Sequence, residues 1–205
     1  MPAGAHAVLV LAAGRSRRLG EPKQLLRHNG EPLLHRVARL GLQTSPAQLL
    51  VVLPAGHPEV AAALKDLPHT PLLNPAPETG LAGSLHRAAP LLQPYRQVLI
   101  LACDQPALQG HHLHALLRGA ASAVAGCAAT AHVGRPGVPA VVPGSWFVQA
   151  GEDAPVRDAG FRARLRALPP EQVWTLHAAE LQHDLDTPED VQRARAAGWL
   201  DEAGT

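Results

Sequence analysis

The sequence has few cysteines, few aromatic residues, no excess of one charge and no long apolar run. Cys103 and Cys127 are the two cysteines among 205 residues, and they form no metal-binding or redox motif, which predicts a reduced, cytoplasmic protein. Aromatic residues make up 3% of the chain, so the core has to be built mainly from Leu, Val and Ala. The net charge of +1 gives no global field for nucleic acid or an acidic membrane. No segment has the length of a membrane span or the form of a signal peptide.

Apolar runs alternate with helix signals along the chain. Runs typical of strands cover 8–11, 49–53, 70–73, 97–102, 122–130, 138–142 and 173–176, and helices are expected after Pro32, from Pro58, from Ser84, over 106–118, in pieces over 145–168 and from Pro188 to Gly198. This alternation predicts an α/β fold with a mostly parallel sheet and helices on both faces. The strands 122–130 and 138–142 are expected to form an antiparallel hairpin. The length predicts one domain over residues 1–205 with a core of about 6–198.

The stretch from Val8 to Lys23 carries the strongest functional signal. A buried strand is expected to end at Leu11, and the side chains then shrink at Ala12, Ala13 and Gly14, which lets a ligand approach the backbone. Polar and cationic residues follow: Arg15, Ser16, Arg17, Arg18 and Lys23. At the carboxyl edge of a parallel sheet such a loop predicts a polyanion site, most simply for a triphosphate. The alternative is a surface loop of solvated arginines. Lys23 is expected to be an exposed cation, whose removal would leave the fold intact.

Two common phosphate-binding loops are excluded at this place. The Walker loop needs Gly-Lys followed by Ser or Thr, whereas Gly20 is followed by Glu21 and Pro22. The dinucleotide fingerprint needs three closely spaced glycines, and only Gly14 and Gly20 are present here. The loop is therefore a triphosphate candidate of another kind.

Asp104 follows the most apolar run of the chain, 97–102, within Cys103-Asp104-Gln105-Pro106. A carboxylate at the end of a buried strand needs a positive partner. A magnesium ion on triphosphate oxygens would be such a partner, and the alternative is that Asp104 caps the following helix. Cys103 is expected to be a small buried packing residue, because no base stands beside it.

Small residues and acidic residues mark two further candidate places. Gly80 and Ser84 lie in a segment rich in small residues, which suits either ligand contact at a helix start or an ordinary loop and cap. Asp184 and Asp186 stand before Thr187, which opens a helix of capping-box type. These two acids could reach the same cation as Asp104, or could only decorate the helix start.

His111, His112 and His114 form the one histidine cluster of the sequence. The spacing indicates a polar helix start. No partner ligand in the sequence supports a metal site there.

Together these motifs resemble the molybdenum cofactor cytidylyltransferase-like nucleotidyltransferases, the MobA/MocA-like NTP transferase family. The resemblance runs from about Val8 to about Val191 and is most specific in the first loop and at 103–106. It implies the Rossmann-like sheet of the nucleotide-diphospho-sugar transferases. It also implies nucleotide contacts for Leu11, Ala12, Ala13, Gly14, Arg15, Ser16, Arg18, Lys23, Gly80 and Ser84, catalytic roles for Arg18, Lys23 and Asp104, and Mg²⁺ ligation by Asp104, Asp184 and Asp186.

The resemblance implies a nucleotidyltransferase that moves a nucleoside monophosphate from CTP to a phosphorylated acceptor, molybdopterin. CTP is implied by the Leu-Ala-Ala-Gly form of the loop, which places Ala13 where guanylyl members have glycine. The family pattern Gly-Asp-x-Gly-Ala-Arg is replaced by Ala159-Gly-Phe-Arg-Ala-Arg164, which leaves the acceptor open. The alternatives are a sugar-phosphate or isoprenoid-precursor nucleotidyltransferase of the same fold, and a nucleotide-binding module without catalysis.

Overall fold

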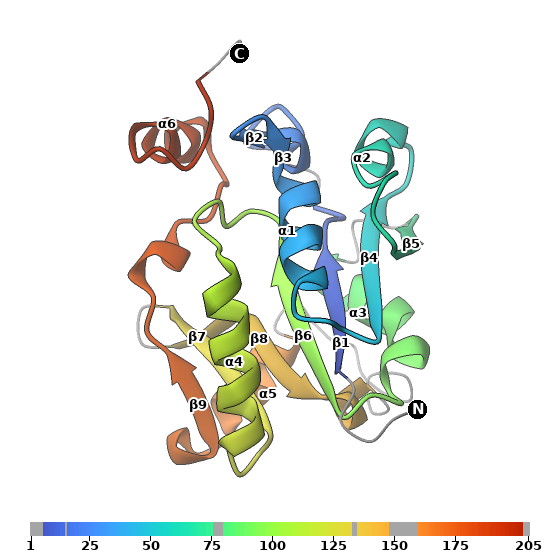
Figure 1. Ribbon diagram of the computed structural model, residues 1–205, viewed down its shortest axis with the longest axis vertical. Helices are drawn as coiled ribbons and strands as arrows, with labels where there is room; N and C mark the ends of the chain where they lie inside the picture. The colour runs from blue at the N-terminus through green and yellow to red at the C-terminus, as the bar shows by residue number, and fades with distance from the viewer. Residues whose placement is uncertain (1–5, 15, 76–79, 133–134, 148–159, 203–205) are drawn as a thin grey trace.

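A seven-stranded sheet runs through the molecule in the order β5-β4-β1-β6-β8-β7-β9 (Figure 1). The computed structural model describes residues 6–14, 16–75, 80–132, 135–147 and 160–202. The strands of the sheet are β1 (His6–Leu11), β4 (Gln48–Pro54), β5 (Thr70–Asn74), β6 (Gln97–Ala102), β7 (Cys127–His132), β8 (Arg135–Pro143) and β9 (Val173–Leu176). A separate small hairpin joins β2 (Arg27–His28) to β3 (Glu31–Pro32).

Six α-helices are seen in the described residues. They are α1 (Leu33–Leu42), α2 (Pro58–Ala62), α3 (Gly80–Leu92), α4 (Gly110–Ser122), α5 (Gly160–Ala167) and α6 (Pro188–Ala196). Short 3₁₀ turns lie at η1 (Lys23–Leu25), η3 (Gly144–Phe147), η4 (Pro170–Gln172) and η5 (Ala179–Gln182). None of the helices in the described part of the chain is long and apolar enough to cross a membrane.

The pairing of the strands confirms the predicted α/β fold. β5, β4, β1 and β6 run parallel to one another, and β9 is parallel to β7. β8 runs antiparallel to both β6 and β7, so the predicted hairpin is present. Because β1, β4, β5 and β6 share one direction, their carboxyl ends meet at one edge of the sheet, where α/β folds bind ligands.

Helices cover both faces of the sheet (Figure 1). Alternate residues of each strand point to opposite faces. Val8, Val10 and Leu99 therefore pack with α1 and α4, whereas Leu9 and Ile100 pack with α3 on the other face. The buried residues of both clusters are mostly Leu, Val and Ala, as the low aromatic content predicts.

Three elements begin four or five residues from their predicted starts. The helix predicted from Ser84 begins at Gly80, and the helix predicted over 106–118 spans 110–122. The second shift arises because Gln109 and His112 form a capping box, so residues 105–108 make a turn before the helix starts. The strand predicted from Ser122 begins only at Cys127, because the helix continues to Ser122 and Gly126, with a φ of 64°, turns the chain.

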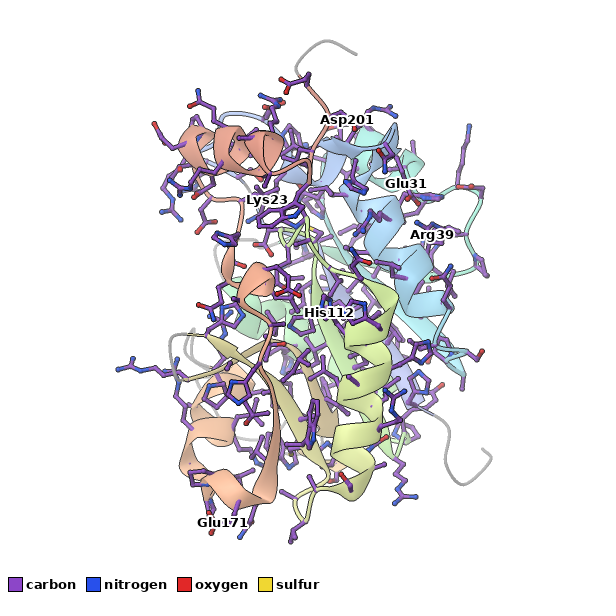
Figure 2. The ribbon with its side chains drawn as sticks, turned by 60° about the vertical axis from the view of Figure 1, so that its left-hand side comes forward. Lys23, Glu31, Arg39, His112, Glu171 and Asp201 are labelled. Carbon is purple, nitrogen blue, oxygen red and sulfur yellow. The ribbon has the colours of Figure 1, made fainter. Side chains whose placement is uncertain are left out.

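The last helix, α6, ties the carboxyl-terminal part of the chain to the β2–β3 hairpin. Thr187 is its N-cap, Pro188 is at its start and Asp190 completes the capping box, as predicted. Residues of both regions form one apolar cluster: Leu26, Leu33, Leu185, Val191, Ala194 and Leu200. Asp201 accepts hydrogen bonds from the backbone N–H groups of Asn29 and Gly30, and Figure 2 shows it beside the end of α6.

Glu31 is an ionic anchor between the hairpin and α1. Its carboxylate accepts two hydrogen bonds from Arg39, at 2.8 and 2.7 Å, and lies 2.6 Å from His35. The Arg39 hydrogen bonds, assisted by His35, outweigh burial and lower the pKa of Glu31 to about 2. Glu31 is therefore ionised throughout the neutral range.

Candidate functional site

A pocket of about 270 Å³ opens at the carboxyl edge of the parallel strands. It is lined by Leu11, Ala13, Gly14, Lys23, Asn74, Ser84, Ala102, Cys103, Asp104, Val138 and Arg162. The first loop, the end of β6 and the start of α3 thus contribute to one cavity, as their positions in the sequence predict.

The small-residue loop after β1 is held in place by Gln24, which sequence reasoning did not single out. Its amide nitrogen, Nε2, donates to the carbonyls of Ala12 at 2.6 Å and Gly14 at 2.9 Å, and the residue is 1% exposed. Ser16 has a φ of 46° and its Oγ accepts from the N–H of Lys23 at 3.2 Å. The loop therefore folds back on itself, and Gly14 leaves its pocket side open to a ligand.

Lys23 is not the exposed cation that the sequence predicts, because it is only 9% exposed. Its Nζ donates to Asp104 Oδ2 at 2.7 Å, to the carbonyl of Leu185 at 3.3 Å and to Asp186 Oδ1 at 3.4 Å. Burial alone would lower the pKa of Lys23, but the charge and hydrogen bond of Asp104 outweigh it and that pKa is raised. Lys23, which is labelled in Figure 2, is therefore a buried, fully charged group.

Asp104 and Asp186 share the cations of the first loop. Arg18 donates to Asp186 Oδ2 at 2.9 Å, with its own side chain 70% exposed. Asp104 does not cap α4, because Gln109 holds the N-cap position, and this removes the capping alternative for Asp104. Asp186 does not supply the cap of α6 either, because Thr187 and Asp190 do so. Neither carboxylate is therefore used as a helix cap.

Asp184 lies in desolvated surroundings near Asp104. Burial, and then the negative charge of Asp104, raise the pKa of Asp184 to about 7. The three aspartates do not form a tight preformed cluster among the described residues, since the group of three ligand atoms within 4.8 Å lies elsewhere. The negative charge of Asp104 still acts on Asp184, and a nearby cation would relieve this repulsion.

The other predicted nucleotide contacts lie in different places. Leu11, Ala13, Gly14 and Ser84 line the pocket, and Ser84 Oγ accepts a 3.3 Å hydrogen bond from Asn74. The side chain of Ala12 is buried in the core instead, so its carbonyl is what the loop uses. Gly80 begins α3. Arg15 lies outside the described residues.

Arg162 is a pocket residue that the family pattern does not assign. Within the segment Ala159–Arg164, of which residue 159 lies outside the described part, Ala163 and Arg164 match the family pattern. Arg164 stacks over the Trp146 ring at 4.2 Å, whereas Arg162 lines the pocket with Lys23 and Asp104. The sequence held no signal for this, because the choice depends on which face of α5 turns toward the sheet edge.

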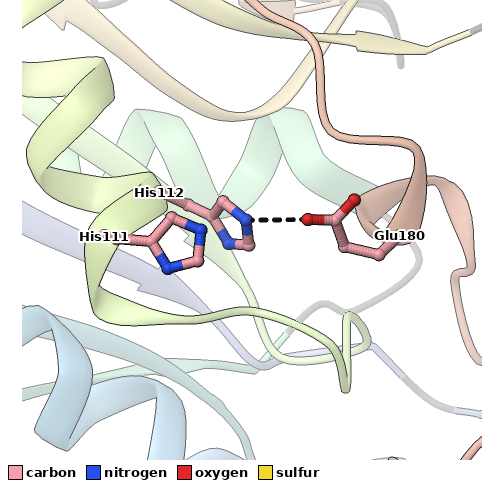
Figure 3. Close-up of side chains that lie close together, drawn as sticks. All are labelled: His111, His112 and Glu180. Atoms are coloured by element: carbon pink, nitrogen blue, oxygen red, sulfur yellow. Dashed lines mark hydrogen bonds and ion pairs between the residues drawn. The ribbon is translucent and has the colours of Figure 1, made fainter.

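The histidine cluster does have a third partner, Glu180 on η5 (Figure 3). His111, His112 and Glu180 each offer a ligand atom within 4.8 Å of the others. However, His112 Nδ1 accepts the N–H of Gln109 at 3.1 Å, and Nε2 lies 3.0 Å from Glu180. A neutral imidazole has one acceptor and one donor nitrogen, so Nε2 donates to Glu180 and no lone pair is left for a metal. The cluster is the polar helix start that the sequence predicts.

A known protein family matches most of the chain. Residues 8–173 match the model of the MobA-like NTP transferase domain. A "Probable molybdenum cofactor guanylyltransferase" from Synechococcus elongatus is 39% identical over 104 residues, which are 50% of this chain and 52% of the relative. The match thus spans about half the length of that curated relative.

Solved structures share the fold over nearly the whole chain. The Rv0371c homologue from Mycobacterium sp. strain JC1 has a TM-score of 0.74 and 26% identity, covering 94% of this chain and 96% of its own. Rv0371c from Mycobacterium tuberculosis H37Rv, solved in complex with manganese, has a TM-score of 0.71 and 20% identity, covering 92% and 97%. The second likeness concerns the fold alone.

The segment that matches the family model contains most of the elements that build the pocket. The match over 8–173 includes the first loop, β6 and Asp104, which are the parts of the chain that build the pocket. It also covers most of the residues. The chain therefore belongs to the MobA-like NTP transferase domain family, a family of nucleotidyltransferases.

Proposed function

We propose that this protein transfers a nucleoside monophosphate from a nucleoside triphosphate to a phosphorylated acceptor and releases pyrophosphate, with Mg²⁺ as cofactor. CTP is the proposed donor and molybdopterin the proposed acceptor. The observation that carries the proposal is the Lys23–Asp104 pair, joined at 2.7 Å, beside the open backbone of Gly14 in one pocket. The reducing cytoplasm is the proposed compartment, and both cysteines are free thiols.

The acidic residues fit a hard divalent cation. Asp104, Asp184 and Asp186 offer carboxylate oxygens, and Mg²⁺ binds to one or two carboxylates together with substrate phosphates. Asp104 and Asp186 already attract the cations Lys23 and Arg18, so these carboxylates lie where positive charge is stable. When bound, the ion would neutralise the charge that develops on the transferred phosphoryl group. The manganese complex of Rv0371c supports a divalent ion at a related fold.

Lys23 and Arg18 would hold the phosphates. In the structure they are paired with Asp104 and Asp186, and an incoming triphosphate offers them oxygens of the same charge. Gly14 would let the phosphates approach the loop backbone, which Gln24 fixes through two carbonyls. The residues of the chain thus position the reactants and neutralise charge, which is most of what phosphoryl chemistry needs.

No protein nucleophile is required in this scheme. Cys103 lines the pocket, but burial raises the pKa of its thiol to about 12. At neutral pH it is therefore a protonated thiol, and the thiolate is the nucleophilic form. Direct attack by the acceptor phosphate on the α-phosphorus remains the simplest route.

The donor base is the finer part of the proposal. Ala13 lines the pocket, and the Leu-Ala-Ala-Gly loop supports CTP, whereas the Synechococcus relative is named as a guanylyltransferase. We expect CTP to be turned over faster than GTP at equal concentration. Faster turnover of GTP would overturn the choice of base and leave the reaction class standing.

The test is a matrix of donors and acceptors. The protein is incubated with Mg²⁺, each of the four triphosphates and each of three acceptors: molybdopterin, a sugar phosphate and an isoprenoid-precursor phosphate. Pyrophosphate and the nucleotidylated product are both measured. We expect both only with molybdopterin. Product with another acceptor would indicate a sugar-phosphate or isoprenoid-precursor nucleotidyltransferase of the same fold. Triphosphate binding without product would indicate a non-catalytic module.

A further inference from the structure

Arg162 is a cation of the pocket with an unused donor. It stands on α5 and is partly buried. Its Nε is buried and has no hydrogen-bond partner among the described residues, although the side chain lines the same pocket as Lys23 and Asp104. A buried N–H group without an acceptor costs free energy. Such a donor is therefore suited to an acceptor that a ligand brings.

The position of Arg162 separates it from the first loop, which is the proposed triphosphate site. The first loop follows β1, whereas α5, which carries Arg162, packs against β8 and against α3. Strand β6 lies between β1 and β8, so these two strands are about 10 Å apart at about 4.8 Å per strand. Arg162 therefore enters the pocket from a side other than that of Gly14 and Lys23.

Arg162 is nevertheless close to the acidic centre of the site. Burial is the main influence on the pKa of Asp184, and the charge of Arg162 acts against it. Asp104 follows the end of β6, the strand between β1 and β8. A phosphate held by Arg162 and a triphosphate held by the first loop would therefore meet beside Asp104.

We propose that Arg162 binds the phosphate group of the acceptor and so makes the site prefer phosphorylated acceptors. The inference rests on the proposed nucleotidyl transfer. An oxygen of the acceptor phosphate forms a bond to the α-phosphorus, the bond from that phosphorus to the bridging oxygen breaks, and pyrophosphate leaves with the electron pair. Arg162 takes no part in proton transfer. Its guanidinium reduces the repulsion between two phosphate anions and orients the attacking group.

This role belongs to Arg162 of this chain rather than to the family pattern. The family pattern Gly-Asp-x-Gly-Ala-Arg has a glycine at the place that Arg162 occupies, and its arginine corresponds to Arg164, which stacks on Trp146. The acidic residue of the pattern is missing as well. A cation in the pocket in place of glycine gives the acceptor side a different charge.

The test compares Arg162→Gln with Arg166→Gln, an exposed arginine of the same helix. Steady-state rates are measured while molybdopterin and CTP are varied separately. Loss of a charge-assisted hydrogen bond should raise the KM for molybdopterin about tenfold to a hundredfold in Arg162→Gln, with the KM for CTP unchanged. Arg166→Gln should match the wild type. Free guanidinium ion at low millimolar concentration should restore part of the rate of Arg162→Ala, which a merely structural role would not allow.

The outcomes separate the two proposals. If the wild type transfers nucleotide and Arg162→Gln has the wild-type KM for molybdopterin, the assignment of Arg162 is wrong and the proposed function stands. The same holds if the KM for CTP rises as much as that for the acceptor. If the wild type transfers nucleotide to none of the acceptors, the proposed function fails and the role of Arg162 fails with it.

Discussion

Removing Lys23 should destabilise the protein as well as abolish triphosphate binding. The Lys23–Asp104 attraction at 2.7 Å corresponds to about 6 kcal/mol at an effective dielectric constant of about 20, and desolvation of both groups offsets much of it. Loss of one partner of a fully buried pair costs about 3–5 kcal/mol. Because the two side chains retain 11% and 21% exposure, we expect Lys23→Ala to lower the free energy of unfolding by about 2–3 kcal/mol.

The cost should come from the unpaired carboxylate rather than from the missing lysine. Asp104→Asn leaves Lys23 bonded to the Leu185 carbonyl and to Asp186, so it should cost only about 1 kcal/mol. The double variant Lys23→Ala with Asp104→Asn removes the unpaired charge and should be about 1–2 kcal/mol more stable than Lys23→Ala alone. Arg18→Ala, which removes an exposed ion pair, is the matched control and should change stability by about 0.5 kcal/mol or less.

Urea unfolding of the four variants and the wild type measures these differences. The free energies come from midpoints at a common slope, without nucleotide or divalent ion. If Lys23→Ala unfolds at the wild-type midpoint, or if the double variant is no more stable than Lys23→Ala, then Lys23 is not a buried partner of Asp104. The reasoning from the pair would then be refuted, whatever the variants do to catalysis.

Three other perturbations test separate parts of the structure. Asp104→Asn should lower the rate of pyrophosphate release about a hundredfold or more at saturating Mg²⁺, which is the scale of one lost transition-state contact. Near-equal rates for the variant and the wild type would refute the proposed metal-binding role of Asp104. Gly119→Ala should cost about 1–3 kcal/mol in urea unfolding, because its Cβ would lie 2.1 Å from Trp174; Gly110→Ala on the same helix meets nothing closer than 3.9 Å and should not destabilise. Glu31 has its folded pKa lowered to about 2, so its contribution to stability is full above its unfolded pKa of about 4.3 and is lost as the pH falls toward 2. Unfolding midpoints of wild type and Glu31→Gln should therefore converge between pH 5 and about 2, and a constant difference would contradict that pKa.

The sequence predicted the sheet and the residues of the first loop because both signals are local. β6 and β9 have the predicted bounds, 97–102 and 173–176, since short apolar runs mark buried strands. The start of α4 was missed because the capping box of Gln109 and His112 decides it, and histidine is not a usual capping-box residue.

The burial of Lys23 could not be read from its neighbours in sequence. Three contacts bury its ammonium group, and they come from Asp104, Leu185 and Asp186. The role of Gln24 was hidden for the same reason, because its amide bonds carbonyls of the preceding loop. Long-range contacts of this kind depend on where the fold brings the carboxyl-terminal segment, and no periodicity within one segment encodes that.

The contacts of Leu185 and Asp186 with Lys23 have a consequence for biosynthesis. Leu185 donates its N–H to the carbonyl of Asp104 at 2.9 Å, and Asp201 secures the turn at Asn29 and Gly30. On the ribosome, Asp104 is made before Leu185, and at about 5–20 residues per second the interval lasts roughly 4–16 s. During that time the nascent chain has β1, β4, β5 and β6 but not the segment that buries Lys23. The finished pocket therefore forms after these strands, and a nascent chain can complete the proposed triphosphate site only after Leu185 and Asp186 have been made.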